Sequence, residues 1–186
     1  MVNIEWNMNE TKEVKGGGQM LPMGAYICKI TSCEDVPEKQ YLKVELDVAE
    51  GDFAGHFGKL FASAGFWGLV DYKSYKGENE TGKGLFKHFI ACLERSNNFT
   101  WNGDEKQLVG KQIGATICHE LYNKQDGTDG RKTKIATYYD VEEIKKGEFT
   151  EPKEKKAKDY KPQENSNDPL PFSDIPAADQ NDDLPF

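Results

Sequence analysis

The sequence is poor in long apolar runs and in cysteine. The uncharged stretch between Lys59 and Asp71 is too short and too rich in glycine to cross a bilayer. The four cysteines lack the dense pattern of a small disulfide-bonded secreted domain, so we expect free thiols in a reducing compartment. The first residues carry acids where a signal peptide needs a basic start and an apolar run. We therefore expect a cytoplasmic protein without a membrane partner.

Positive charge is also scarce. Lys and Arg total 24 against 32 Asp and Glu, which leaves a net charge of -8. A wholly basic surface is excluded, so any site for a polyanion must be a local patch. Apolar residues make up only 37% of the chain and charged residues 30%. This balance indicates that part of the chain does not fold.

The composition divides the chain into three regions. Residues 150–186 hold lysines first and acids last, with many prolines and almost no aliphatic residues, so we predict a disordered acidic C-terminal tail. Residues 1–23 contain the Gly16–Gly18 break and little periodicity, and we predict a loose N-terminal arm. Residues 24–149 are the predicted folded domain.

Periodicity within this domain predicts strands and one clear helix. In Tyr41–Val48 the apolar residues occupy every second position, as in a half-buried strand. From Leu85 to Ser96 they recur at helical spacing. Turn residues before Arg131 predict a hairpin between the last two strands. The full set of predicted elements is strands at 25–33, 41–48, 53–61, 112–122 and 131–139, and helices at 85–96 and 141–146.

Five strands with a helix between the third and the fourth is the connectivity of the OB-fold. This small, mainly β barrel binds single-stranded nucleic acid in many proteins. We predict such a five-stranded OB-fold barrel for residues 24–149. A generic five-stranded α+β sheet is the alternative that the same pattern allows.

No catalytic or metal-binding constellation stands out. Residues 77–83 match the first seven positions of the phosphate-loop pattern, but Gly84 replaces the magnesium-binding hydroxyl, and we predict a flexible surface loop there. The cysteines and histidines lack the paired spacing of structural zinc sites. Cys118 and His119 would point to opposite faces of one strand. We expect no enzymatic activity, no cofactor and no metal.

Aromatic residues interleaved with lysines favour a binding function. Single-stranded DNA is held by rings that stack on bases and by cations that follow the phosphates. Phe57, Lys59 and Phe61 would share one face of the predicted third strand, and a second basic patch begins at Arg131. Packing in the core is the competing interpretation for each ring. The predicted DNA-binding residues are Phe57, Lys59, Phe61, Trp67, Tyr72, Lys73, Tyr75, Lys76, Lys87, Tyr122, Arg131, Lys132 and Lys134.

The last six residues, Asn181–Phe186, carry the most specific signal in the chain. They resemble the acidic tip of bacterial single-stranded DNA-binding proteins, in which acids precede an aliphatic residue, a proline and a terminal Phe. Residues 167–172 are a near copy. In that family the tip docks onto replication, recombination and repair proteins. The resemblance implies this role for Asp182, Asp183, Leu184, Pro185 and Phe186, whereas the alternative is an ordinary acidic tail that ends in Phe.

Residues 20–150 resemble a family of phage-encoded single-stranded DNA-binding proteins. The resemblance rests on Leu21–Tyr26, on the central glycine-rich aromatic segment with its helix, and on the pattern from Val109 through Arg131 to Gly147. It implies an OB-fold that coats single strands during phage DNA replication and recombination in the host cytoplasm. The sequence thus predicts a sequence-independent single-stranded DNA-binding protein, with a homo-oligomer left open. A non-DNA-binding interaction adaptor that uses the same tip is the alternative.

Overall fold

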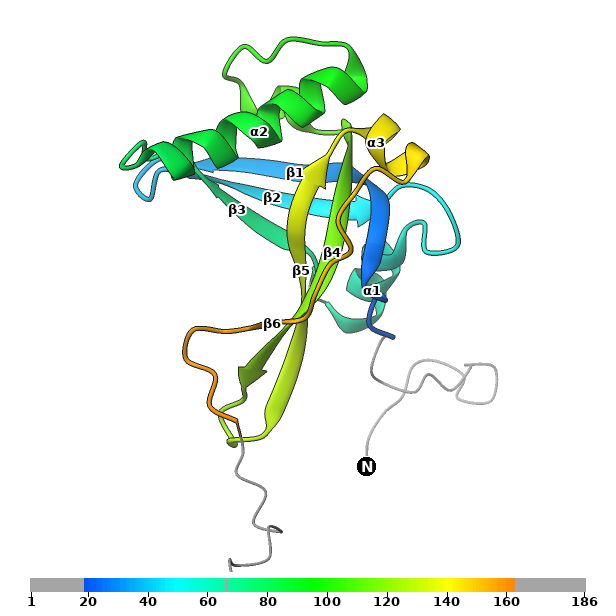
Figure 1. Ribbon diagram of the computed structural model, residues 1–186, viewed down its shortest axis with the longest axis vertical. Coiled ribbons are helices and arrows are strands. Elements are labelled where there is room, and N and C mark those ends of the chain that lie inside the picture. Colours follow the sequence, from blue (N-terminus) through cyan, green and yellow to red (C-terminus); the bar gives the residue numbers. More distant parts are fainter. Residues whose placement is uncertain (1–18, 66, 163–186) are drawn as a thin grey trace, which may run out of the picture.

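The computed structural model describes residues 19–65 and 67–162, which form a mainly β fold (Figure 1). Five strands pair antiparallel in the order β3-β2-β1-β4-β5, and a short sixth strand runs parallel to β4. The strands are β1 (Gly24–Val36), β2 (Tyr41–Val48), β3 (Val70–Ser74), β4 (Gln112–Asn123), β5 (Asp129–Tyr139) and β6 (Lys155–Lys156). The helices are α1 (His56–Ala64), α2 (Glu80–Asn97) and α3 (Val141–Lys146), with a 3-10 turn, η1, at Glu105–Leu108. Among these described helices, none combines the length and apolar character that a membrane crossing requires.

The sheet is open between its two edge strands, β3 and β5. Within residues 19–65 and 67–162 no backbone ladder joins them. Side chains approach across the opening instead, because the Tyr138 hydroxyl on β5 donates a 2.7 Å hydrogen bond to Asp71 on β3. The prediction of a mainly β domain is confirmed, whereas the closed barrel is not present as a continuous ladder.

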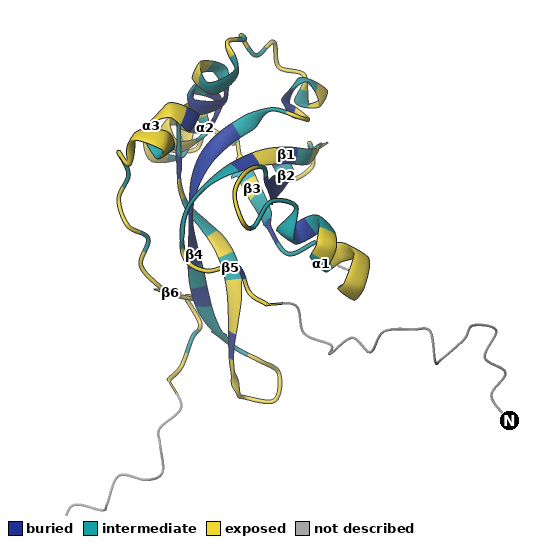
Figure 2. Ribbon diagram, turned by 90° about the vertical axis from the view of Figure 1, so that its right-hand side faces the viewer, coloured by how far each residue is buried: buried dark blue, intermediate teal, exposed yellow. Residues whose placement is uncertain are grey.

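The core lies between the sheet and α2, which crosses one end of the sheet together with α3 (Figure 1). Along β2 the apolar residues at every second position are buried, as the period of two predicted, whereas β4 is buried on both faces from Ile113 to Cys118. Phe89 and Leu93 of α2 are fully buried against them. Figure 2 shows β4 buried along much of its length and the far end of α1 exposed.

The predicted third strand, residues 53–61, is wrong. This segment forms a turn and the first part of α1, and the third strand of the sheet is β3. The buried side chain of Asp47 accepts hydrogen bonds from the backbone N–H groups of Phe57 and Gly58 at 2.8 and 2.9 Å. These bonds satisfy donors that the first turn of a helix leaves unpaired. A cap supplied by a neighbouring strand therefore stabilises the helix.

Residues 77–83, which match part of the phosphate-loop pattern, also differ from the predicted flexible loop. α2 begins at Glu80 rather than Leu85, and the Asn79 side chain accepts a 2.7 Å hydrogen bond from the Gly82 N–H. An N-cap of this kind is a strong helix start. Residues 79–84 are thus the cap and first turns of α2 rather than a flexible loop.

The predicted limits of the folded domain are too narrow. Leu21 is fully buried, and its carbonyl lies 2.8 Å from the His119 ring, so residues 19–23 belong to the domain rather than to a loose arm. Residues 151–162, predicted as disordered tail, run beside β4, where the Ala157 N–H donates to the Leu121 carbonyl at 2.8 Å. Residues 1–18 and 163–186 lie outside the described residues, and the predictions for them stay predictions.

Candidate nucleic-acid interface

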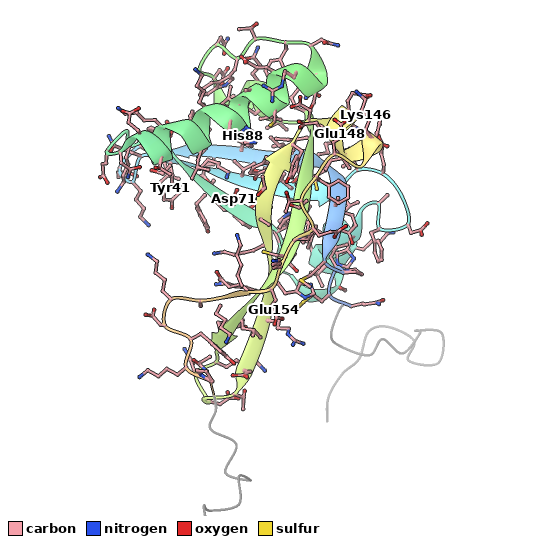
Figure 3. The ribbon with its side chains drawn as sticks, viewed as in Figure 1. Tyr41, Asp71, His88, Lys146, Glu148 and Glu154 are labelled. Carbon is pink, nitrogen blue, oxygen red and sulfur yellow. The ribbon has the colours of Figure 1, made fainter. Side chains whose placement is uncertain are left out.

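A groove of about 450 Å³ lies in the opening between β3 and β5. Residues 67–72, which lead into and begin β3, form one wall, and residues 132–135 of β5 form the other. Lys155 of β6 also lines it. Figure 3 labels Asp71 on β3 and Glu154 beside β6, on either side of this opening. The groove therefore brings together three segments that lie far apart in the sequence.

A second hollow of about 410 Å³ adjoins the first and shares Gly68, Lys132 and Thr133 with it. α1 contributes Leu60 to this part, and the β4–β5 hairpin contributes Tyr122. We refer to the two hollows together as the β3–β5 groove. Its two walls come from the two edge strands of the open sheet, β3 and β5.

Two aromatic side chains line the β3 side of the groove. Tyr72 is 56% exposed, and its ring meets that of Tyr41 edge-on at 5.1 Å. Trp67 is half-buried, and its indole N–H donates to the Leu46 carbonyl at 2.9 Å. Tyr72 is therefore exposed enough for a base to stack on its ring, while the hydrogen bond of Trp67 holds its indole in one orientation.

Two lysines of β5 face the same groove and share one carboxylate. The ammonium groups of Lys132 and Lys134 lie 2.8 and 2.9 Å from the two oxygens of Glu120 on β4. Burial alone would raise the pKa of the Glu120 carboxyl, but the hydrogen bonds from both lysines outweigh burial and lower that pKa. Because one carboxylate serves two ammonium groups, positive charge is in excess here. Both lysine side chains remain about half exposed, at 50% and 49%.

Arg131 and Lys73 are engaged in separate ion pairs. The Arg131 Nε lies 2.9 Å from Glu154, and the Lys73 ammonium lies 2.9 Å from Asp71. Lys73 also lies over the Tyr138 ring, 4.4 Å from its centre. Each of these two cations is matched by a carboxylate of its own, whereas Lys132 and Lys134 share the single carboxylate of Glu120. Lys132 and Lys134 are thus the better placed cations.

The structure brings part of the predicted DNA-binding set to this groove. Six exposed or half-buried members line it, namely Trp67, Tyr72, Tyr122, Arg131, Lys132 and Lys134. Lys73 lies next to it through its ion pair with Asp71, a lining residue. The clustering of residues 67–73 with residues 122–134 could not be read from their separation in the sequence.

The predicted strand face of Phe57, Lys59 and Phe61 is wrong, because all three residues lie on α1. Phe57 is 1% exposed and belongs to the core, so its ring is not available to stack on a base. Lys59 donates to the Ala54 carbonyl at 3.1 Å, and Phe61 is 51% exposed on the outer surface of α1. The alternative interpretation as a core residue is confirmed for Phe57, and Trp67 and Tyr75 pack partly buried against the same core.

Tyr75, Lys76 and Lys87 lie away from the groove. The Tyr75 hydroxyl donates to Asp35 at 2.5 Å, and its ring packs on Phe86 of α2. Lys76 and Lys87 are exposed before and within the first half of α2. None of these three residues lines the groove, although Tyr75 and Lys76 are close to Tyr72 in the sequence.

Lys155 and the path of residues 151–162 were not predicted from the sequence. The Asn123 side chain bonds both backbone groups of Lys161, at 2.9 and 2.7 Å, and the Tyr160 hydroxyl donates to Asp129 at 3.0 Å. These bonds hold the segment along the β4–β5 hairpin. The lysine run of residues 153–161 was the available signal, but a two-residue strand is too short to show a period.

The cysteines and histidines of the described residues form no group of three or more possible metal ligands. Burial raises the pKa of the Cys28 and Cys92 thiols to about 12, so both stay protonated at neutral pH.

Cys118 is fully buried, whereas the half-buried His119 bonds the Leu21 carbonyl. This agrees with their predicted placement on opposite faces of one strand.

Comparison with known proteins assigns no family. No protein-family model matches the chain, and no curated protein matches it closely enough in sequence to count as a relative. The resemblance to phage single-stranded DNA-binding proteins therefore stays a prediction from motifs.

Proposed function

We propose that this protein binds single-stranded DNA without sequence preference in the β3–β5 groove and performs no catalysis itself. The observation that carries the proposal is the meeting of Trp67 and Tyr72 with Lys132 and Lys134 across the open edge of the sheet. Rings of this kind stack on any base, and the ammonium groups attract any phosphate, so no base-specific contact is required. In a chain of net charge -8, this local positive excess matters more than the overall charge.

We also propose that the domain is an OB-fold barrel whose last seam is formed by side chains. The pairing order β3-β2-β1-β4-β5, with α2 between β3 and β4, supports this, because an OB-fold has the same strand neighbours and the same helix position. In that fold, oligonucleotides bind over strands 2 and 3 and the neighbouring loops, including the one between strands 4 and 5. The β3–β5 groove shares β3 with that face and reaches Tyr122 near the end of β4, close to the β4–β5 loop.

A second part of the proposal concerns the C-terminal residues Asp182, Asp183, Leu184, Pro185 and Phe186. These lie outside the described residues, so the support is their sequence: a terminal Phe fits an apolar pocket while acids steer the approach to a basic partner. The chain leaves the described domain at residue 162, directly after the bonds between Lys161 and Asn123. We propose that the tip recruits proteins of phage DNA replication or recombination to the coated strand.

Fluorescence anisotropy with a labelled oligo-thymidine tests the DNA-binding site. The full chain should bind the single strand much more tightly than a duplex of the same length. Tyr72→Ala should weaken binding by the value of one stacked base, about 1–3 kcal/mol. Tyr72→Phe is the matched control, because it keeps the ring and should keep the affinity.

Two results would overturn this assignment. If Tyr72→Ala bound oligo-thymidine as tightly as the unaltered chain, Tyr72 would not belong to the site. If the full chain ignored oligo-thymidine at low salt, the DNA-binding proposal itself would fail. Retention of replication or recombination proteins by the tip in that case would favour the interaction adaptor.

A further inference from the structure

A pocket of about 350 Å³ lies at the other end of β3 and is separate from the β3–β5 groove. Tyr75 follows β3, Phe86 comes from α2, and Trp101 lies in the loop between α2 and η1. Asp35 at the end of β1 and Glu105 at the start of η1 complete its walls. We call this the aromatic–acidic pocket. The proposed DNA site uses none of these five residues.

Three rings form a continuous wall of the pocket. The ring centres of Tyr75 and Phe86 are 6.1 Å apart, and those of Phe86 and Trp101 are 5.8 Å apart. Trp101 is fixed by two hydrogen bonds of 2.9 Å, from its indole N–H to the Asp104 carbonyl and from its backbone N–H to Glu94. The rings are thus held in place before any ligand arrives, which lowers the entropy cost of binding.

Two carboxylates face the same space without a balancing cation. Among the residues that the structure describes, neither Asp35 nor Glu105 forms an ion pair. The Asp35 carboxylate accepts the 2.5 Å hydrogen bond of the Tyr75 hydroxyl, which raises the pKa of Tyr75 and keeps that hydroxyl protonated. Burial raises the pKa of the nearby Cys33 thiol to about 11, and the charges of Glu105 and Asp35 add to this effect. The pocket is therefore both aromatic and negative.

We propose that the aromatic–acidic pocket binds the side chain of an arginine from a partner polypeptide. Aromatic faces attract cations, and the attraction grows when the cation is partly desolvated. A planar guanidinium can lie against a ring and still direct N–H donors to two carboxylates, which a lysine ammonium does less well. The charge of the pocket complements this ligand and no other common side chain except lysine.

A nucleobase is the main competing occupant, because it also stacks on rings. A base in this pocket would bring its phosphates close to Asp35 and Glu105, and like charges so close cost free energy. The pocket therefore favours a cationic polypeptide over DNA. This inference is independent of DNA binding in the β3–β5 groove.

NMR of the full-length chain with nitrogen-15 in its tryptophans tests the proposal. The probe is an acetylated Gly-Arg-Gly amide, and the same peptide with citrulline in place of arginine is a neutral control of nearly equal shape. The indole N–H signal of Trp101, assigned by its loss in Trp101→Phe, should shift and saturate with the arginine peptide at millimolar concentration. The citrulline peptide should leave it in place.

Variants of the pocket sharpen the test. Glu105→Gln, which keeps the shape and removes one charge, should weaken arginine-peptide binding about three- to tenfold, as should Phe86→Leu, which removes one ring. Glu148→Gln changes an exposed acid outside the pocket and should bind as the unaltered chain does.

Four results would overturn the proposal. The first two are an unmoved Trp101 signal with the arginine peptide and an equal shift with the citrulline peptide. The third is equal or tighter binding of a Gly-Lys-Gly peptide, which would contradict the choice of arginine. The fourth is a shift of the Trp101 signal by oligo-thymidine that the arginine peptide reverses, which would assign the pocket to DNA. Because the peptide arms need no DNA, their failure leaves the proposed DNA site untouched.

Discussion

The Tyr138 hydroxyl and the Asp71 carboxylate are 2.7 Å apart and join β5 to β3. In the described part of the chain, no backbone ladder connects these two strands. Tyr138 is 3% exposed, and Lys73 bonds the same carboxylate at 2.9 Å. Since Asp71 also lines the β3–β5 groove, this hydrogen bond fixes the spacing of the two walls on which the proposed DNA site depends.

Replacing Tyr138 by Phe should destabilise the domain by about 1–2 kcal/mol, because Asp71 loses a buried donor while the ring still fills the core. Lys73 keeps the carboxylate paired, which limits the loss. Urea denaturation followed by tryptophan fluorescence measures the change. Tyr72→Phe removes a hydroxyl at a 56% exposed position and should change the unfolding free energy little. Equal stability of the two variants would contradict a closing role for Tyr138.

The burial of Tyr138 beside Asp71 makes the domain sensitive to alkali. Burial, followed by the charge of Asp71, raises the pKa of Tyr138 well above the ordinary value of 10.0. Because the folded pKa is the higher one, the stabilisation is complete below pH 10 and is lost as the pH rises toward the folded value. Stability measured against pH should therefore fall above pH 10 in the unaltered chain and fall less steeply in Tyr138→Phe. Parallel curves would show that Tyr138 does not cause the alkaline loss.

Glu120 holds Lys132 and Lys134 together and competes with phosphate for both of them. Glu120→Gln should therefore tighten binding to oligo-thymidine at low salt. It should also steepen the plot of log affinity against log salt, by about 0.7 for each additional phosphate that a lysine neutralises. The lysine ends of these ion pairs are about half exposed but the Glu120 carboxylate is buried, so Glu120→Gln should also lower the unfolding free energy, by about 1–2 kcal/mol. An unchanged affinity and slope would show that Glu120 does not compete with the DNA.

Lys134→Ala should have the opposite effect on that plot and make it shallower by about 0.7, since one phosphate is no longer neutralised by the protein. Lys87→Ala, which removes an exposed lysine of α2, should match the unaltered chain. The proposed groove would be contradicted if Lys87→Ala and Lys134→Ala weakened binding equally.

Removal of residues 167–186 should tighten binding to oligo-thymidine. The acids of residues 167–186 belong to the same chain as the groove, and we expect this linkage to give them an effective concentration high enough to compete with phosphates. A titration of the shortened and full chains at one fixed salt concentration measures the effect. The shortened chain retains residues 151–162, which pack on β4, so the domain itself stays complete. Weaker binding by the shortened chain would refute this competition.

Local periodicity predicted most of the fold. β2 and α3 have the predicted ends, and β4 and β5 differ from the prediction by a few residues. These elements alternate cleanly or have clear caps, so their own residues determine them. Residues 53–61 fit two periods, because Phe57 and Phe61 are an even number apart on a strand and one turn apart on a helix. The hydrogen bonds that the Asp47 carboxylate accepts from the backbone of Phe57 and Gly58 favour the helix over the strand.

The candidate site was predicted only in part. Lysines beside aromatics indicated Trp67, Tyr72, Lys132 and Lys134, but Tyr72 and Tyr75 have nearly the same neighbours in the sequence. Their difference arises from tertiary structure, since Tyr72 lines the groove and the Tyr75 hydroxyl bonds Asp35 on β1. Residues 151–162 were missed because they are ordered by packing against β4 and not by a core of their own.

The sequence by itself determined the alternation along β2 and the helix between the hairpins. These features depend on neighbours within a few positions. Only the tertiary structure decided which ring faces a groove, which cation is already paired and how β3 meets β5. Those outcomes depend on atoms contributed by residues that are distant in sequence, such as Tyr138 and Asp71, and no local pattern encodes their distance.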